Sequence, residues 1–281
     1  MELRILTPEL LPAFLPYLSD EAVQAIREKQ EGLLALGAVT DDFHSCGAAC
    51  AAADPEGLVL FSLFVDPQIR RQGVASLLLN RLEEQAPIVD ACSFVPQEDL
   101  AGLTAFLNVR GFRLDCEESP VMQLRCSDMR QSPRCRRAFL PNFRPDSNVV
   151  PFSQLTDGEL EELLRDDSIP AYLRPDHFEQ EVLTSPLSFA YRYKGAPAAY
   201  FLAVPVADGA AVKAAVSRSM AHGAAFLQLA SAAIHASLPG LTPTSSYWLE
   251  AVNESSLTMA KYLCSDGFRL WYDCYAYREE N

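Results

Sequence analysis

The stretch LVLFSLFVDPQIRRQGVASLLLNRLEEQ, residues 58–85, contains the change of pattern that decides the fold of the chain. It begins with an unbroken apolar run, residues 58–65, whose length and borders are typical of a buried strand. Pro67 ends this strand, because proline has no backbone N–H to give to a β-ladder. After Gly73 the apolar residues recur at helical spacing, and Pro87 ends the predicted helix. The stretch therefore predicts a strand, a polar loop and an amphipathic helix in direct succession.

The junction between this strand and this helix has the features of a phosphate-binding site. The first N–H groups of a helix have no partner within the helix and carry the positive end of its dipole. Gly73 and Ala75 leave room for a bulky group near the backbone, and Arg70 and Arg71 add positive charge. The junction therefore predicts a cradle for a phosphate at the helix N-terminus. It is neither a P-loop nor a dinucleotide fingerprint, because it has no Gly-Lys-Ser/Thr and no G-x-G-x-x-G.

The same residues resemble the acetyl-CoA motif of the GNAT N-acyltransferases. The family motif is Arg/Gln-x-x-Gly-x-Gly/Ala, and Arg70, Gly73 and Ala75 occupy its defining positions. A V-x-P sequence precedes the motif, and the Gly-Phe pair at residues 111–112 resembles the second motif of the family. The resemblance implies that the loop amides hold the CoA pyrophosphate and that the strand end bonds the pantetheine arm. The residues it assigns to acetyl-CoA, as a co-substrate, are Leu63, Phe64, Val65, Arg70, Arg71, Gln72, Gly73, Val74, Ala75 and Ser76.

The composition limits the classes of partner. The chain has 281 residues, of which 49% are hydrophobic and 21% charged, an ordinary globular mixture with room for about two domains of ~100–200 residues. Its net charge of −14 argues against a nucleic-acid partner, which needs a basic face, and permits a cationic acceptor such as an amine. No apolar run approaches the ~20 residues that span a bilayer, and no signal peptide is visible. We therefore expect no membrane partner and a cytoplasmic location.

The cysteines and histidines predict no metal site. None of the eight cysteines forms C-x-x-C, and the four histidines do not fall at zinc spacings. In a cytosolic chain of this length we expect reduced, mostly buried thiols.

The order of elements predicts two domains of one fold. The first half reads as strand, two helices, three strands, helix, strand, helix and strand, which is the GNAT order; residues 112–125 form its last strand, bent at Ser119-Pro120. The second half repeats the pattern helix, strand, helix, Gly-Phe, strand, and Gly267-Phe268 matches Gly111-Phe112. We predict an α/β (α+β) chain with two tandem GNAT-like domains, each a mixed, mainly antiparallel sheet flanked by helices.

The two predicted domains differ in their motif. The N-terminal domain, residues 1–126, carries the intact motif, and residues 127–147, with three prolines and five arginines, are expected to form a linker. The C-terminal domain, residues 148–281, keeps the Gly-x-Ala but has Met220 at the position of Arg70 and lacks the V-x-P. We therefore assign CoA to the first domain; the sequence leaves the oligomeric state open.

The chemistry that the resemblance implies is attack of a neutral amine on the thioester carbonyl. A backbone amide near Phe64 or Val65 would polarise the carbonyl, a base would take the amine proton and an acid would protonate the thiolate. The sequence departs from the family here: the usual tyrosine position holds Leu107, and the strand holds Ser62 where a glutamate is frequent. The catalytic residues are therefore not identified. Polar candidates, for each of which packing or hydrogen bonding is the alternative role, are Cys92, Ser93, Asn108 and Tyr262.

Two functions follow from these expectations. The first is an acetyl-CoA-dependent N-acyltransferase that moves an acetyl group to an amine of a small molecule or peptide. The alternative is a non-catalytic acyl-CoA-binding protein with a degenerate active site.

Overall fold

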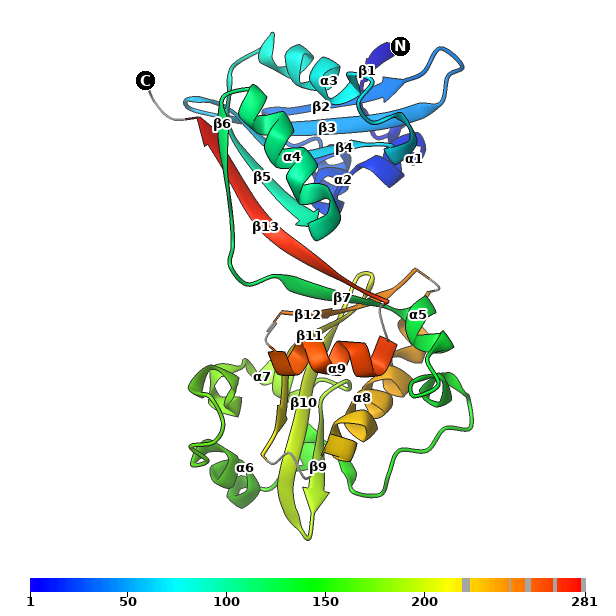
Figure 1. Cartoon of the computed structure of the whole chain (residues 1–281), viewed down its shortest axis with the longest axis vertical. Helices are drawn as coiled ribbons and strands as arrows, with labels where there is room; N and C mark the ends of the chain where they lie inside the picture. The colour runs from blue at the N-terminus through cyan, green and yellow to red at the C-terminus, as the bar shows by residue number, and fades with distance from the viewer. Residues whose placement is uncertain (219–222, 243, 251–253, 265–266, 279–281) are drawn as a thin grey trace. The chain divides into compact units, whose positions relative to one another are not determined.

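The computed structural model describes residues 1–218, 223–242, 244–250, 254–264 and 267–278 (Figure 1). The chain forms two compact units: the first unit is Met1–Glu118 with Tyr272–Asn281, and the second unit is Ser119–Trp271. Each unit is a mixed, mainly antiparallel sheet with helices on both faces. The predicted fold class and the tandem arrangement are thereby confirmed.

The first unit follows the predicted order of elements. Its strands and helices are β1 (Glu2–Ile5), α1 (Leu11–Phe14), η1 (Leu15–Tyr17), α2 (Asp20–Glu28), β2 (Leu33–Val39), β3 (Ser45–Asp54), β4 (Gly57–Val65), η2 (Pro67–Ile69), α3 (Val74–Glu83), β5 (Ile88–Pro96), α4 (Gln97–Val109) and β6 (Phe112–Cys116), joined by the end of β13 (Phe268–Arg278). The Ser19 hydroxyl caps α2 by accepting from the Ala22 N–H at 3.2 Å, which satisfies one of the open donors of the first turn.

The sheet of the first unit has the strand order β1-β2-β3-β4-β5-β13-β6. β1 to β4 pair antiparallel, whereas β4 and β5 pair parallel over a short ladder that ends at Leu60 and Ala91. A register shift lies next to Ser62, which pairs with Cys50, while Leu60 pairs with Ala51. Phe61 is therefore the extra residue of a β-bulge, a feature that bends a strand and increases its twist.

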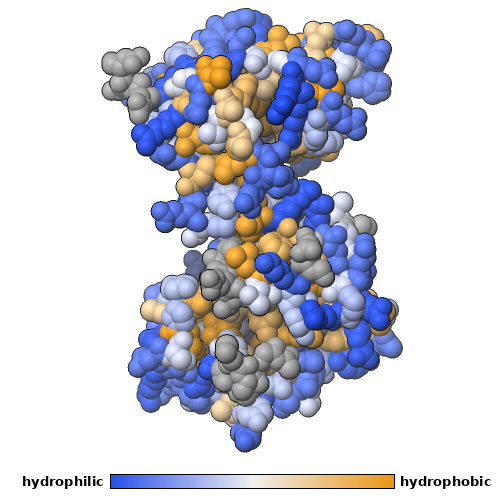
Figure 2. Space-filling view, viewed as in Figure 1, coloured by the Kyte–Doolittle hydropathy of each residue, from blue (hydrophilic) through white to orange (hydrophobic). Residues whose placement is uncertain are grey.

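Helices cover both faces of this sheet. Side chains of α3 and α4 share one core with residues such as Ala49 and Ala91, and we call this side the α3/α4 face. Side chains of α1 and α2 share a second core with Ala48 and Cys50, and we call this side the α1/α2 face. Figure 1 shows α4 lying over the sheet, and Figure 2 shows apolar residues among polar ones on that side of the first unit.

The second unit repeats the architecture. Its elements are β7 (Val121–Arg125), α5 (Cys126–Gln131), η3 (Arg136–Phe139), β8 (Val149–Pro151), η4 (Phe152–Gln154), α6 (Asp157–Leu164), η5 (Ala171–Leu173), η6 (Pro175–His177), α7 (Gln180–Thr184), β9 (Phe189–Tyr193), β10 (Ala196–Val206), β11 (Gly209–Ser217), α8 (Gly223–Ser237), η8 (Leu238–Gly240), β12 (Ser246–Leu249), α9 (Glu254–Cys264) and the start of β13. The strand order is β8-β9-β10-β11-β12-β7-β13, with β11 and β12 as the parallel pair. β8 to β12 thus take the places of β1 to β5.

The halves of the chain exchange strands. The strand beside β5 in the first unit is the end of β13, which comes from the C-terminus of the chain. The strand beside β12 in the second unit is β7, which follows directly on β6. The segment expected as one bent strand, residues 112–125, is therefore two strands that belong to different units.

The compact units consequently differ from the boundaries expected from chain order, 1–126, 127–147 and 148–281. The first unit ends at Glu118 and takes back residues 272–281. Residues 127–147, expected as a linker, include most of α5 and all of η3, and Met129 and Phe139 are buried in the core of the second unit. The prolines and arginines of this segment favoured the expectation of a linker, although its apolar residues pack in the core of the second unit.

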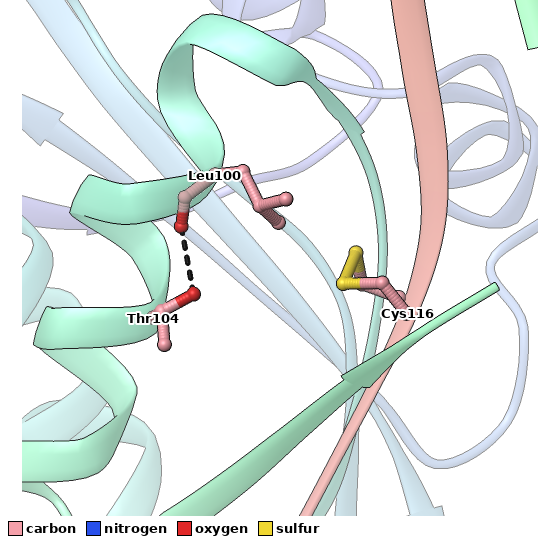
Figure 3. The surroundings of a disulfide bond; sticks show 4 residues. Leu100, Thr104 and Cys116 are labelled. Carbon is pink, nitrogen blue, oxygen red and sulfur yellow. Dashed lines mark hydrogen bonds between the residues drawn. A yellow bond between two sulfur atoms is a disulfide. The ribbon is translucent and has the colours of Figure 1, made fainter. Parts of the chain in front are cut away.

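A disulfide bond joins Cys116 of β6 to Cys274 of β13, with Cα atoms 4.0 Å apart. The expectation of reduced thiols is wrong for these two residues, because strand pairing places them opposite each other although 158 residues separate them. Figure 3 shows the bond on the α3/α4 face, with Leu100 and Thr104 of α4 beside it. The other cysteines are free, and of these only Cys92 is exposed.

Among the described residues, none of the helices is long and apolar enough to cross a membrane.

Candidate active site

The end of β4 presents backbone groups to the side where β5 departs. The Asp66 N–H donates to the Cys46 carbonyl of β3 at 3.0 Å. Backbone N–H groups alternate between the two sides of a strand. The N–H group of Phe64 therefore also points towards β3, whereas the N–H groups of Leu63 and Val65 point to the opposite side. The β4–β5 ladder has already ended at Leu60, so the amides of Leu63 and Val65 point into the widening gap between the two strands.

This alternation refines the expectation for carbonyl polarisation. Of the two amides proposed from the sequence, that of Val65 faces the gap and that of Phe64 is turned towards β3. The Phe64 side chain is 38% exposed and lies 6.1 Å from the Tyr17 ring, on the α1/α2 face.

The loop after β4 is shaped by local contacts. Asp66 accepts from the Gln68 N–H at 2.8 Å and starts the 3₁₀ turn η2. Arg71 then takes a left-handed φ of 65°, and Gly73, at the N-cap of α3, takes a φ of 85°. Glycine is the residue that adopts this conformation without steric cost.

The N-terminus of α3 is open. A Cβ built on Gly73 would meet no atom within 4 Å, and Arg71, Gln72 and Gly73 are all exposed. Val74 is buried and anchors the first turn in the α3/α4 core. The unpartnered amides and the dipole of this ten-residue helix can therefore hold an anionic group at this point.

Arg70 is part of the frame of the loop. Its Nε donates to the Val65 carbonyl at 3.1 Å, and its guanidinium pairs with Asp99, in the first turn of α4, at 2.6 Å. The guanidinium also lies 5.4 Å from the centre of the Phe64 ring. Arg70 thus ties the end of β4 to the start of α4, and the exposed Arg71 is the cation of the pair that faces solvent.

Arg110, the C-cap residue of α4, links the end of α4 to α3. Its guanidinium donates to the Ser76 carbonyl at 3.1 Å and to the Asn80 side chain at 2.7 Å. It also forms a salt bridge with Glu83 at 3.2 Å. The backbone of Ser76, in the first turn of α3, is thereby held against the end of α4.

The four polar candidates from the sequence lie on three different elements. Cys92 and Ser93 lie on β5, with Cys92 exposed and Ser93 half-buried. Asn108 is exposed near the end of α4. Tyr262 belongs to α9 of the second unit, where the Arg134 guanidinium lies 3.6 Å from its ring centre.

Cys92 is poorly suited to act as a thiolate. Burial first, and then the negative charges of Asp90 and Glu21, raise the pKa of its thiol. A raised pKa keeps the sulfur protonated near neutrality, where a nucleophilic cysteine needs the opposite environment.

Sequence reasoning missed Asp90 and Tyr275. Asp90 lies on β5 at the end of the ladder, and Tyr275 lies on β13, the strand beside β5. A hydrogen bond to Asp90, followed by burial, raises the pKa of Tyr275 to about 12. The available signal was a carboxylate interrupting the apolar run of residues 88–95; the partner tyrosine had no local signal.

The corresponding position in the second unit is acidic. Arg218, just after β11, forms a salt bridge with Glu162 at 2.6 Å and another with Asp166, and it donates to the Pro197 carbonyl at 2.7 Å. Two further carboxylates, Glu161 and Asp167, line the same pocket. Met220 and His222 of the degenerate motif lie outside the described residues.

Residues 3–111 match the Acetyltransferase (GNAT) family. This segment, 109 of the 281 residues, is therefore similar to the GNAT acetyltransferases. The match covers β1 to α4 of the first unit, the part that contains the open α3 N-terminus. None of the curated protein sequences matches the chain.

Solved structures with similar folds include GNAT proteins of one and two domains. A GCN5-related N-acetyltransferase of Sphaerobacter thermophilus has 14% identity and a TM-score of 0.44 and covers 98% of this chain and 94% of its own. A tandem GNAT protein from the clavulanic acid biosynthesis pathway has 14% identity and a TM-score of 0.45, with coverage of 98% and 97%. The paia N-acetyltransferase of Thermoplasma acidophilum, in complex with coenzyme A, has 19% identity and a TM-score of 0.29, with coverage of 42% and 92%. The fold assignment rests on the sheet topology of the chain itself.

Proposed function

We propose that this protein is an acetyl-CoA-dependent N-acyltransferase that moves an acetyl group to the amine of a small molecule or peptide. Residues 63–65 and 70–76 of the first unit would hold acetyl-CoA. The observation that carries the proposal is the succession of the end of β4, where the β4–β5 ladder has stopped, and the open α3 N-terminus, where a Cβ built on Gly73 meets no atom within 4 Å. Amides in such a succession suit pantetheine first and then a diphosphate.

The residues of the first unit then have separate roles. The loop amides of residues 71–76 and the α3 dipole bind the diphosphate, and Arg70 holds the loop against α4. The Val65 amide donates to the thioester carbonyl oxygen, where negative charge develops. The amine nitrogen bonds to the carbonyl carbon while the C–S bond breaks, and the sulfur leaves as a thiolate.

The acidic surroundings of Arg218 support placing CoA in the first unit. A diphosphate beside Glu162 and Asp166 would meet like charges, and both described cations that line this pocket, Arg165 and Arg218, already pair with its carboxylates. A cytoplasmic location remains part of the proposal. The disulfide is unusual for a reducing compartment.

A non-catalytic acyl-CoA-binding protein is the alternative. The lack of an acid–base pair among the first-unit candidates Cys92, Ser93 and Asn108 favours it. Release of free thiol from acetyl-CoA, measured against a panel of amines, separates the two functions. We expect thiol release that depends on both the amine and the protein. CoA binding without thiol release for any amine would establish the alternative.

The rate should depend on pH through the acceptor. An alkylammonium group has a pKa near ~10, so only about one molecule in a thousand is the free amine at neutral pH. The pKa values of Cys92 and Tyr275 are both raised, so both groups stay protonated near pH 7 and neither can take the amine proton. We expect kcat/KM to keep rising with pH towards the pKa of the acceptor.

The measurement is a pH–rate profile on two acceptors of different basicity, where the two curves should rise to different limits. A positioned base typically contributes ~10²–10⁴ in rate. A plateau that begins near pH 7 for both acceptors would show that a group of the protein removes the proton.

A further inference from the structure

The exchanged strand places aromatic side chains on the α1/α2 face beside the open part of β5. Ala276 of β13 is fully buried in the α3/α4 core. Alternation along the strand therefore turns Tyr275 and Tyr277 to the opposite face, where their rings stack with centroids 5.9 Å apart. On β5, Ala91 is buried in the same α3/α4 core, so Asp90 and Cys92 also turn to the α1/α2 face.

This surface is accessible. Tyr275 and Phe94 are each 43% exposed, and Cys92 is exposed between Phe94 and Asp90 along β5. The surface begins at Ala91, where the β4–β5 ladder ends, so it adjoins the gap that the Val65 amide faces. An acceptor approaching from the α1/α2 face would meet it before reaching that gap.

The described carboxylates that act on Tyr275 and Cys92 make this part of the surface acidic. Asp90 and, more weakly, Asp54 raise the pKa of the Tyr275 hydroxyl, which lies on the strand beside β5 and on the same face as Asp90. Cys92 lies in the fields of Asp90 and Glu21. Carboxylates next to exposed aromatic rings attract ammonium groups both by direct ion pairing and by cation–π interaction.

We propose that Asp90, oriented by Tyr275 from the exchanged strand and flanked by Phe94, binds the charged amine of the acceptor and selects alkylammonium acceptors over neutral amines. The inference rests on the proposed acyltransferase function. Asp90 receives the charge of the acceptor and not its proton. The bound ammonium first loses one proton to water, and the free amine nitrogen then bonds to the carbonyl carbon as the C–S bond breaks. The nitrogen thereby becomes positively charged again, and the same carboxylate stabilises it until its second proton leaves to water.

In this arrangement Tyr275 is a positioning residue. Its hydroxyl, on the same face as Asp90, would donate to the carboxylate and orient it, and an ionised carboxylate can still accept from the acceptor through its remaining lone pairs. Tyr277 provides a matched control, because it lies on the same face of the same strand and donates to Asp115 at 3.1 Å. Asp115 belongs to β6, one strand further from the gap.

The test compares Asp90→Asn, Tyr275→Phe and Tyr277→Phe with the wild-type protein. The probes are 1,4-diaminobutane and benzylamine, which are cations at neutral pH, and aniline, which is neutral. Binding of each probe to the CoA-loaded protein is measured by NMR titration, and kcat and KM are measured with acetyl-CoA. We expect Asp90→Asn to weaken binding and raise KM about tenfold for the two cations and less than twofold for aniline, since hydrogen bonds to charged groups are the stronger class.

Tyr275→Phe should give a smaller loss, about three- to fivefold, for the cations alone, and Tyr277→Phe should give none. The double variant at Asp90 and Tyr275 should bind no worse than Asp90→Asn, because the tyrosine acts through the carboxylate. CoA affinity should be the same in all variants, which also shows that each variant is folded.

Equal effects of Asp90→Asn on aniline and on the cations would overturn the inference, as would wild-type protein that binds aniline as tightly as benzylamine. Failure of the proposed function is a separate outcome, seen as absence of CoA binding by the wild-type protein.

Discussion

Replacing Gly73 by glutamate should abolish CoA binding to the first unit. The Gly73 position is open, with no atom within 4 Å of a built Cβ, so the new side chain extends into the space above the α3 N-terminus. There its carboxylate would meet the diphosphate as a like charge and would itself occupy the amides and the helix dipole. We expect the dissociation constant for CoA, measured by calorimetry, to rise at least about a hundredfold, or about 2.7 kcal/mol.

Gly73→Ala separates the effect of charge from that of the backbone. Alanine meets the same left-handed φ of 85° and therefore carries the same conformational cost, about 1–2 kcal/mol, without a carboxylate. Circular dichroism should show both variants folded, and the alanine variant should bind CoA far better than the glutamate variant. Gly223→Glu, at the matching position of the second unit, should leave CoA affinity unchanged. Unchanged affinity in Gly73→Glu would refute the site.

The parts of the fold that could be predicted from the sequence are those fixed by local pattern. The apolar run and the helical repeat of residues 58–85 are properties of neighbouring residues, and β4 and α3 lie where these patterns place them. The open N-terminus of α3 was also predictable, because Gly73 and the loop before it lie within a few residues of each other.

The exchange of strands could not be predicted in the same way. A strand of alternating residues carries no mark of which strand it will pair with, so residues 112–125 read as one strand of one domain. The structure separates β6 and β7 and sends the end of β13 to the first unit. The pairing of Cys116 with Cys274 depends on this exchange, as does the contact between Tyr275 and Asp90.

The site shows the same division between local and distant information. The backbone cradle came from the motif, but the role of Arg70 depends on Asp99, which is 29 residues away. The candidates Cys92 and Ser93 lie on β5 and Asn108 near the end of α4, and local pattern could not show whether these elements bring them into contact. Asp90 was visible as a carboxylate within an apolar strand, and only the neighbouring strand gives it a partner.

Reducing the disulfide should destabilise the first unit. Cys116 and Cys274 both belong to this unit, although the whole of the second unit lies between them in the sequence. A bond that closes a loop of 158 residues removes much of the freedom of the unfolded chain, and removal of a native disulfide typically costs about 2–5 kcal/mol. The bond also fixes the residue next to Tyr275 on the exchanged strand. We therefore expect Cys116→Ser with Cys274→Ser, or wild-type protein in dithiothreitol, to unfold several degrees lower, with faster amide exchange in β13.

The double serine variant is the control for the reductant, because dithiothreitol should no longer lower its Tm. Cys92→Ser removes the exposed free thiol and should leave both the Tm and its response to dithiothreitol unchanged. Mass spectrometry of alkylated protein should count two fewer reactive thiols before reduction than after it. If the alkylation count shows that the bond is formed, equal Tm values with and without reductant would contradict the prediction. The strand ladders alone would then hold β13, without a contribution from loop closure. An alkylation count that reduction does not change would mean that the two cysteines are unpaired, and the stabilisation expected from the bond would be absent with it.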